Sequence, residues 1–390
     1  MISKSLAGLV CALAVVCMTV MGVYAYEYFQ TEYAPSPGAF SARKLPRHPS
    51  GLHAYGVMDQ IESGSVLVME TNTGRVIFEA DGFSRRYPAS VTKVMTAIIV
   101  LENVHDLDEL VHFSRNAVNL PWYAARLWMV YGETLTVRDA LYGIMLSSGN
   151  DVARALAEHV SGSIDAFVDK MNRRAVEMGA YNTRFVNPCG LPGYNQHITA
   201  YDIALIMREA VQIPTFVEII STAYYPFPPT YEHPEGRVIH NTHRMIRRVF
   251  EYEFDPRIVG GKTGFTNAAQ HTLVSYARQD DYSLIVSALF SPNRTTFTDT
   301  RILMNHAFGV LAFERAEQIR LEHERLQRER ELALLQERDT ISLSGPQSKY
   351  LPLTPIYVSD TEALVIAASS LGLAVFSLGI IKLIYSRKDY

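Results

Sequence analysis

Three short segments hold the residues best suited to chemistry: Ser-Val-Thr-Lys at 90–93, Ser-Gly-Asn at 148–150 and Lys-Thr-Gly at 262–264. A serine hydroxyl is a weak nucleophile at neutral pH until a neighbouring base takes its proton. Residues three apart share one face of a helix, so Lys93 would lie beside the hydroxyl of Ser90. An apolar environment lowers the pKa of a lysine and lets it accept that proton. The residue types and spacing of the first segment therefore suit an activated serine.

The same segment opens a predicted helix. Pro88 is a helix-start signal, and an apolar run continues to Val100. Ser90 would fall in the first turn, whose free backbone N–H groups can stabilise a developing negative charge. A lone Ser-x-x-Lys sequence is more typical of a helix start with a solvated lysine. The chemical interpretation therefore depends on the companion segments.

The second segment interrupts two helical patterns within residues 141–158. A polar turn between apolar helices can bring a hydroxyl and an amide into a cleft. There Ser148 could relay a proton, and Asn150 could form a hydrogen bond with a substrate amide. Taken alone, both residues are more typical of a helix cap.

The third segment precedes two stretches rich in strand-forming residues, 271–277 and 282–290. This pattern predicts antiparallel strands, with Lys262, Thr263 and Gly264 on the first of them. A strand that borders a cleft can pair with an extended peptide, and Gly264 keeps its backbone accessible. Lys262 and the Thr263 hydroxyl suit a terminal carboxylate. Alone, Lys262 would be an ordinary hairpin-edge lysine, and only the co-occurrence of the three motifs favours the chemical interpretation.

In this order, the three motifs resemble the active-site signature of the low-molecular-weight penicillin-binding proteins, specifically the D-alanyl-D-alanine carboxypeptidases. The resemblance covers roughly residues 54–313. It implies an α/β (α+β) fold of the penicillin-binding protein and β-lactamase-like transpeptidase type, with an antiparallel sheet flanked by helices and a helical subdomain. Further stretches that share the resemblance are 64–76, 87–97, 187–191, 199–204 and 241–243.

By position, the resemblance implies that Ser90 forms the acyl-enzyme and that Lys93 is its general base. It also implies that Ser148 shuttles protons and that Asn150 holds the peptide amide. These roles match the chemistry read from the residue types.

The resemblance further implies that Lys262 and Thr263, on the strand with Gly264, bind the terminal carboxylate. The oxyanion hole would consist of the backbone N–H groups of Ser90 and Phe265. Phe265 stands where many relatives have histidine, which preserves a backbone donor there. Cys189 occupies the position of another frequent histidine.

Both ends of the chain carry apolar segments. Residues 1–25 combine a basic Lys4, an apolar run and a small-residue ending at Ala25, which predicts a signal peptide; an uncleaved anchor is the alternative. Residues 362–385 include an uncharged apolar stretch of membrane-spanning length followed by basic residues. They predict a single transmembrane helix with a cytoplasmic tail, 386–390. The catalytic domain would then lie outside the bacterial cytoplasmic membrane, beside the cell wall.

The remaining segments complete the predicted domain organisation. A linker at 26–53 leads to a serine D,D-peptidase domain at 54–312. Residues 313–341 alternate Glu and Arg densely, which predicts a salt-bridged, exposed helical stalk. Its apolar heptad stripe is too thin for more than a weak coiled coil. A second linker at 342–361 joins the stalk to the predicted membrane helix.

Composition narrows the partners. The formal net charge of −4 argues against a nucleic-acid partner. His240 and His243 could be mistaken for a metal pair, but no third ligand is spaced to complete a site, so we expect neither a metal nor a cofactor.

Three functions compete for these residues. The first is a carboxypeptidase that removes the terminal D-alanine from peptidoglycan stem peptides and is acylated by β-lactam antibiotics. The second is a β-lactamase, which typically needs a deacylating Glu-x-x-Leu-Asn segment; residues 177–182 do not match it. The third is a non-catalytic, membrane-anchored wall-binding or antibiotic-sensing module, whose short tail leaves little room to transmit a signal. The carboxypeptidase is favoured.

Overall fold

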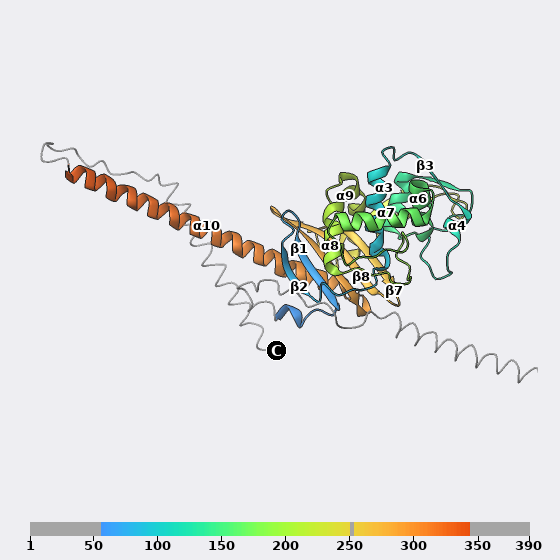
Figure 1. Ribbon diagram of the computed structural model, residues 1–390, viewed down its shortest axis with the longest axis horizontal. Coiled ribbons are helices and arrows are strands. Elements are labelled where there is room, and N and C mark those ends of the chain that lie inside the picture. Colours follow the sequence, from blue (N-terminus) through green and yellow to red (C-terminus); the bar gives the residue numbers. More distant parts are fainter. Residues whose placement is uncertain (1–55, 250–252, 344–390) are drawn as a thin grey trace, which may run out of the picture. The chain divides into compact units, whose positions relative to one another are not determined.

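The computed structural model describes residues 56–249 and 253–343, and its core is an antiparallel sheet of five strands (Figure 1). The strand order is β2-β1-β9-β8-β7, so the first strand lies inside the sheet beside the last. The strands predicted at 271–277 and 282–290 are confirmed as β8 and β9. The bounds are β1 Ser65–Glu70, β2 Val76–Ala80, β7 Ile258–Thr266, β8 Gln270–Gln279 and β9 Tyr282–Ser291.

The other elements of the described chain are short sheets and helices. Two-stranded sheets pair β3 Leu110–His112 with β4 Thr134–Thr136, and β5 Tyr224–Phe227 with β6 Arg237–His240. The α-helices are α3 Lys93–Asn103, α4 Arg115–Val118, α5 Val137–Leu146, α6 Asn150–Ser161, α7 Ile164–Glu177, α8 Ala200–Ala210, α9 Pro214–Ser221 and α10 Thr296–Leu343. Three 3-10 turns are η1 Ala89–Thr92, η2 Arg244–Ile246 and η3 Pro292–Arg294.

The central sheet is covered on both faces. Side chains alternate across a strand, and in β1 this places Leu67 and Met69 in a large core with α3, α5, α6 and α8. Val66 and Val68 face the opposite way, into a second core that includes Leu303 of α10. This arrangement explains why every residue of β1 is buried. The expectation of an antiparallel sheet flanked by helices is confirmed.

α3 runs through the larger core. Its residues from Lys93 to Val100 are all buried. Apart from Lys93 and Thr96 these residues are apolar, as expected of a helix surrounded by protein on every side. Lys93, the first residue of this helix, is therefore removed from solvent when the surrounding core folds.

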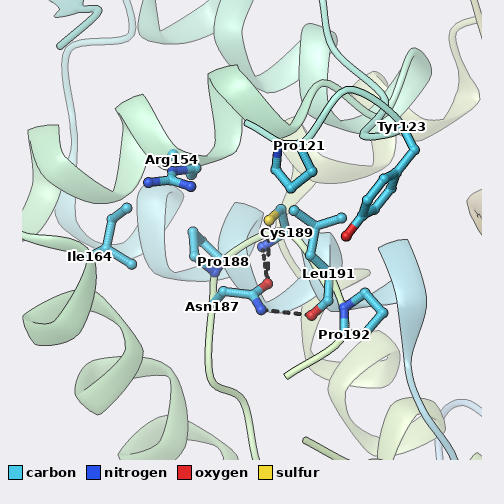
Figure 2. A pocket seen from close by; sticks show the side chains of 9 residues that line it. All are labelled: Pro121, Tyr123, Arg154, Ile164, Asn187, Pro188, Cys189, Leu191 and Pro192. Carbon is cyan, nitrogen blue, oxygen red and sulfur yellow. Dashed lines mark hydrogen bonds between the residues drawn. The ribbon is translucent and has the colours of Figure 1, made fainter. Parts of the chain in front are cut away.

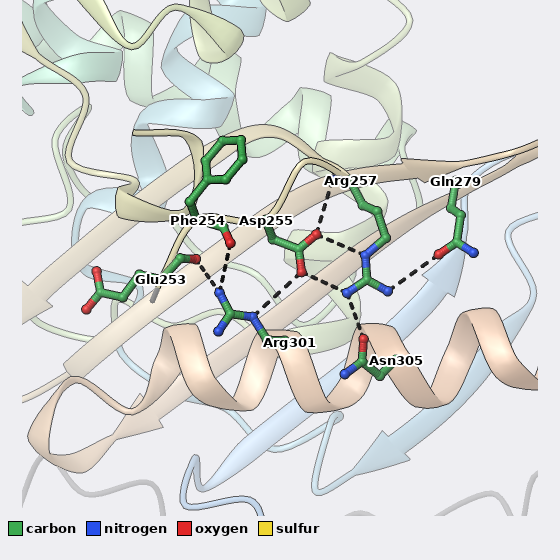
Figure 3. Close-up of polar contacts among 7 residues, drawn as sticks. All are labelled: Glu253, Phe254, Asp255, Arg257, Gln279, Arg301 and Asn305. Atoms are coloured by element: carbon green, nitrogen blue, oxygen red, sulfur yellow. Dashed lines mark hydrogen bonds and ion pairs between the residues drawn. The ribbon is translucent and has the colours of Figure 1, made fainter. Parts of the chain in front are cut away.

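An ionic cluster fastens the start of α10 to the segment before β7 (Figure 3). The buried carboxylate of Asp255 lies 2.7 Å from the Arg257 guanidinium and 3.6 Å from that of Arg301. Arg257 also donates to Asn305 of α10 at 2.7 Å. Burial opposes the ionisation of Asp255, but the hydrogen bonds from Arg257 outweigh it and hold its pKa below the ordinary value. The cluster thus fixes the entry to β7.

α10 contributes to two compact units, which divide after Gln318. Within the first unit its early turns are core residues as far as Leu311. Within the second unit it is a charged helix, with ion pairs between Arg320 and Glu324 at 2.6 Å and between Arg325 and Glu322 at 3.0 Å. The predicted stalk residues, 313–341, belong to this one helix, which continues through Leu343, slightly beyond the predicted boundary.

Several predicted segments lie outside the described residues. They are the signal peptide at 1–25, the linker at 26–53, nearly all of the linker at 342–361, the transmembrane helix at 362–385 and the tail at 386–390. Within the described part of the chain, no helix combines the length and apolar character needed to cross a bilayer.

Candidate active site

Ser90 lies in the 3-10 turn η1, immediately before α3. The prediction placed it in the first turn of an α-helix; the structure shows that the α-helix begins at Lys93 instead. Ser90 is half-buried while Ala89, Val91 and Thr92 are buried, so the turn presents the serine at the edge of the core. Thr272 of β8 donates to the Pro88 carbonyl at 3.1 Å and holds this turn against the sheet.

Lys93 connects the predicted residues to one another. Its Nζ donates to Ser90 Oγ at 3.0 Å, to Asn150 Oδ1 at 2.6 Å and to the Cys189 carbonyl at 2.8 Å. The side chain is fully buried, and burial lowers its pKa to about 8, although the nearby Asp151 opposes the shift. A lysine with this pKa can accept a proton from serine near neutral pH.

Asn150 is the first residue of α6. Its backbone N–H donates to the Ala125 carbonyl at 2.9 Å, which fixes the turn that carries it. Because its Oδ1 accepts from Lys93, the amide is oriented, and within the described chain its Nδ2 donates to no protein group. This leaves an oriented donor for a substrate carbonyl.

Ser148 lies in the turn between α5 and α6 with a left-handed φ of 64°. Unlike Ser90 and Asn150, its hydroxyl forms no hydrogen bond with any described residue. The sequence placed it on the correct turn, and its proton-relay role stays a prediction.

The Lys-Thr-Gly segment lies on β7, the edge strand of the described sheet. Gly264 permits the close approach of β7 to Ser90, because a Cβ at this position would lie 2.7 Å from the Ser90 backbone nitrogen. Phe265 follows with an exposed ring that contacts His271 at 4.5 Å between centroids. The predicted oxyanion donors, the N–H groups of Ser90 and Phe265, thus belong to segments that meet at Gly264.

Lys262 is as deeply buried as Lys93. Its Nζ donates to the Thr263 carbonyl at 3.0 Å. Burial, and then the nearby charge of Lys93, lower its pKa well below the ordinary value. The Thr263 hydroxyl lies 2.6 Å from the Thr242 hydroxyl. A bound anion would favour the charged form of Lys262, so the site is complementary to a carboxylate.

Sequence reasoning missed the part played by the loop around Cys189. The loop supplies a backbone carbonyl to Lys93, while the cysteine thiol is buried and faces Asn187 Oδ1 at 3.3 Å. Gly190 has a φ of 84°, and a Cβ there would lie 1.8 Å from the Ala89 carbonyl oxygen. The only sequence signal was the Asn-Pro-Cys-Gly stretch, because a backbone carbonyl can come from any residue type.

His240 and His243 do not form a common site. His243 is buried and lies 2.8 Å from the Ser275 hydroxyl, and burial lowers its pKa to about 3, whereas His240 is exposed on β6. The described residues contain no group of His, Cys, Asp or Glu side chains arranged to hold a metal ion.

Comparison with known proteins identifies the family to which the chain belongs. The sequence signature of the family described as "D-alanyl-D-alanine carboxypeptidase" matches residues 53–292, more than half of the 390-residue chain. The protein therefore belongs to this family of penicillin-binding proteins.

Individual relatives and a solved structure are consistent with this family. The chain is 32% identical over 229 residues to "D-alanyl-D-alanine carboxypeptidase DacF" of Bacillus subtilis, covering 57% of this chain and 56% of that protein. It is 33% identical over 220 residues to a "D-alanyl-D-alanine endopeptidase" of Escherichia coli, covering 55% and 67%. A solved D-alanyl-D-alanine carboxypeptidase of Mycobacterium tuberculosis superposes with a TM-score of 0.57 at 29% identity, covering 64% and 91%. The fold is thus that of the penicillin-binding proteins.

Proposed function

We propose that the protein is a serine-type D-alanyl-D-alanine carboxypeptidase that removes the terminal D-alanine from peptidoglycan stem peptides. The observation that carries this proposal is the buried Lys93 Nζ, which bridges Ser90 Oγ and Asn150 Oδ1 at 3.0 and 2.6 Å. The proposed nucleophile Ser90, its base Lys93 and the amide of Asn150 are therefore already connected by hydrogen bonds.

The reaction proceeds through an acyl-enzyme. Ser90 Oγ attacks the carbonyl of the penultimate residue while Lys93 takes its proton. The tetrahedral oxyanion is stabilised by the backbone N–H groups of Ser90 and Phe265. Its collapse breaks the peptide bond, and the leaving D-alanine amine takes the proton. Water then attacks the ester carbonyl while Lys93 takes one of its protons. The bond between the acyl group and Ser90 Oγ breaks, Ser90 recovers the proton from Lys93, and the shortened peptide leaves as a carboxylate. A β-lactam enters the same first step through its ring carbonyl, which makes it a covalent inhibitor.

The carboxypeptidase specificity rests on the strand that carries Lys262. A peptide added along β7 would bring its C-terminal carboxylate to Lys262 and the Thr263 hydroxyl. An internal peptide bond offers no carboxylate there. This argument favours terminal cleavage over the endopeptidase activity named for the E. coli relative.

The two remaining alternatives are less well supported. A β-lactamase needs a base for rapid deacylation, and within the described chain no carboxylate forms a hydrogen bond with Ser90 or Lys93. A wall-binding module that is never acylated would not require a base whose burial lowers its pKa to about 8. An antibiotic sensor would need the same base, and it differs from a carboxypeptidase in releasing no D-alanine over repeated turnovers.

A pentapeptide ending in D-Ala-D-Ala tests the proposal. The wild-type chain should release D-alanine over many turnovers and form a penicillin adduct on Ser90, and Ser90→Ala should lose both. Ser221→Ala, which alters an exposed serine on α9, is the matched control. An adduct on Cys189 in mass spectrometry, or an undiminished adduct in Ser90→Ala, would contradict the assignment.

We also propose that the enzyme acts on the outer side of the cytoplasmic membrane, exported by residues 1–25 and held by a helix at 362–385. The apolar composition of both segments supports this. Truncation after Gly345 should move the protein from the membrane to the soluble fraction while small-peptide activity survives. Activity on intact cell wall should fall, because tethering raises the effective concentration. A truncated protein that stays in the membrane fraction would show that residues 1–25 remain as an anchor.

A further inference from the structure

A hollow of about 250 Å³ lies beside the catalytic centre (Figure 2). Its walls come from the loop at 187–192, from α6 through Arg154, and from the loop after α4 through Tyr123. In the view of Figure 2, the 187–192 loop lies between Arg154 on one side and Tyr123 on the other. The volume is below that of most sites for a whole ligand and is suited to one side chain.

The hollow adjoins the nucleophile through two shared elements. Cys189 lines it, and the carbonyl of the same residue accepts from Lys93 at 2.8 Å. Arg154 follows Asn150 by four positions on α6, so both lie on one face of the helix, about 6 Å apart along its axis. An extended peptide advances about 3.3 Å per residue, so this distance corresponds to about two residues.

Arg154 is the only charged residue that lines the hollow. Its guanidinium donates to Asn116 Oδ1 at 2.7 Å and, at a long 3.5 Å, to the Asn119 carbonyl. Its Nε is buried and has no partner among the described residues. Nor does any described carboxylate pair with it: Glu158, one turn further along α6, instead accepts from Ser114 at 2.6 Å and from Asn116 at 2.7 Å.

The remaining walls are largely apolar or already satisfied. Ile164 and Leu191 contribute aliphatic surface, and Tyr123 contributes an aromatic ring. The Asn187 side chain is occupied, since it donates to the Leu191 carbonyl at 2.8 Å and accepts from the Gly190 N–H at 2.7 Å. A single cation at the wall of a hollow with mixed polar and apolar lining is complementary to a carboxylate on a short aliphatic arm.

We propose that this hollow is a specificity subsite that binds a free carboxylate on the residue about two positions before the acylated one, with Arg154 as its partner. The inference rests on the proposed function, since it assumes that a peptide acylates Ser90 and extends from there past Asn150. It divides peptide recognition between two cations: Lys262 for the terminal carboxylate and Arg154 for one further upstream.

Two pentapeptides ending in D-Ala-D-Ala test this. They differ only at the residue two positions before the penultimate D-alanine, which is glutamate in one and glutamine in the other. The full chain should favour glutamate about tenfold in kcat/KM, mainly through KM, as expected for one hydrogen-bonded charge. Arg154→Gln should bring the ratio to about one, and Arg154→Lys should keep part of it. Arg173→Gln, which removes an exposed arginine from α7, should keep it all.

The outcomes separate the two proposals. Release of D-alanine at equal rates from both peptides by the wild-type chain would overturn the subsite and leave the carboxypeptidase intact. No release from either peptide would overturn the proposed function, and the subsite with it. A preference for glutamate that persists in a folded Arg154→Gln variant would show that another group binds the carboxylate. If the Arg154→Gln variant does not fold, the ratio of kcat/KM for the two peptides is measured in Arg154→Lys, and a ratio equal to that of the wild-type chain would contradict the role of Arg154.

Discussion

Lys93 and Lys262 are both fully buried, yet their surroundings differ. Lys93 has three acceptors within 3.0 Å, whereas the neighbouring Thr263 carbonyl is the one acceptor that Lys262 has among the described residues. The pKa of Lys93 falls to about 8, and that of Lys262 also lies well below its ordinary value, through burial and then through the nearby charge of Lys93.

The difference is that the protein itself supplies the partners of Lys93, whereas the site around Lys262 lacks an anionic partner until a ligand binds. Lys93 is held in place before any substrate arrives, as a base must be if it is to act in the transition state. The positive charge of Lys262, which lies near that of Lys93, is compensated only when an anion binds. A substrate carboxylate would therefore raise the pKa of Lys262, and the ligand itself would establish the charge that binds it.

Replacing the base should have the largest effect. Lys93→Met keeps most of the side-chain volume and removes the amine, so acylation by penicillin should slow about a thousandfold, within the usual range for a general base. Stopped-flow measurement should place the loss in the acylation rate constant rather than in the dissociation constant. Lys170→Met, which alters a half-buried lysine of α7 that donates to Asn103, is the control. An equal loss in binding would mean that Lys93 serves mainly to shape the site.

Acidification should reproduce much of that loss without a mutation. As the proposed base, Lys93 would act through its neutral amine, so the acylation rate should rise with pH as the lysine loses its proton near pH 8. Between pH 6 and pH 8 the neutral fraction grows about 50-fold, and the rate at saturating β-lactam should follow it. A flat profile over this range would contradict the role of Lys93 as base.

Removing the other lysine should have a smaller and substrate-dependent effect. Lys262→Met should lower kcat/KM for peptides with a free C-terminal carboxylate by about 10- to 100-fold, the value of one charge-assisted contact. Analogues with an amidated C-terminus should lose far less. Steady-state kinetics on the matched pair measure the difference. If kcat/KM falls equally for the free and the amidated peptides, Lys262 does not bind the terminal carboxylate, and the proposed difference between the two lysines is wrong.

The smallest effect should come from the neighbour of Thr263. Thr242→Val removes the hydroxyl that lies 2.6 Å from Thr263 Oγ1, while Thr242→Ser retains it. We expect a rise in KM of about three- to tenfold in the valine variant, as for one neutral hydrogen bond. If the serine variant is impaired to the same degree, the methyl group of Thr242 matters rather than its hydroxyl.

Much of the catalytic centre was predictable because its chemistry is local in sequence. The i and i+3 spacing placed Lys93 beside Ser90, and strand-forming residues placed Lys262 on β7. The Cys189 carbonyl was not predictable, since a backbone acceptor leaves no mark on residue type. Arg154 also gave no signal, because a helical arginine is normally solvated and its cavity exists only after distant segments meet.

The fold shows the same limit. The charge pattern at 313–341 predicted a helix, which the structure contains. It did not predict that the helix begins at Thr296 with core residues as far as Leu311, because the helix passes from a buried to a charged stretch without a break, even across Gly309. The 3-10 geometry at Ser90 was likewise invisible, since its residues are compatible with either helix type.

The pairing of β1 with β9 has a consequence for how the protein acquires activity. Ser65 of β1 is paired with Leu289 of β9, so the first strand cannot complete its pairing until nearly the whole catalytic domain has been synthesised. Such long-range contacts make folding slow, because a large loop must close before they form. The elements around Ser90, Asn150 and Lys262 are assembled on this sheet. A chain that is still emerging should therefore be unable to react with either a peptide or a β-lactam.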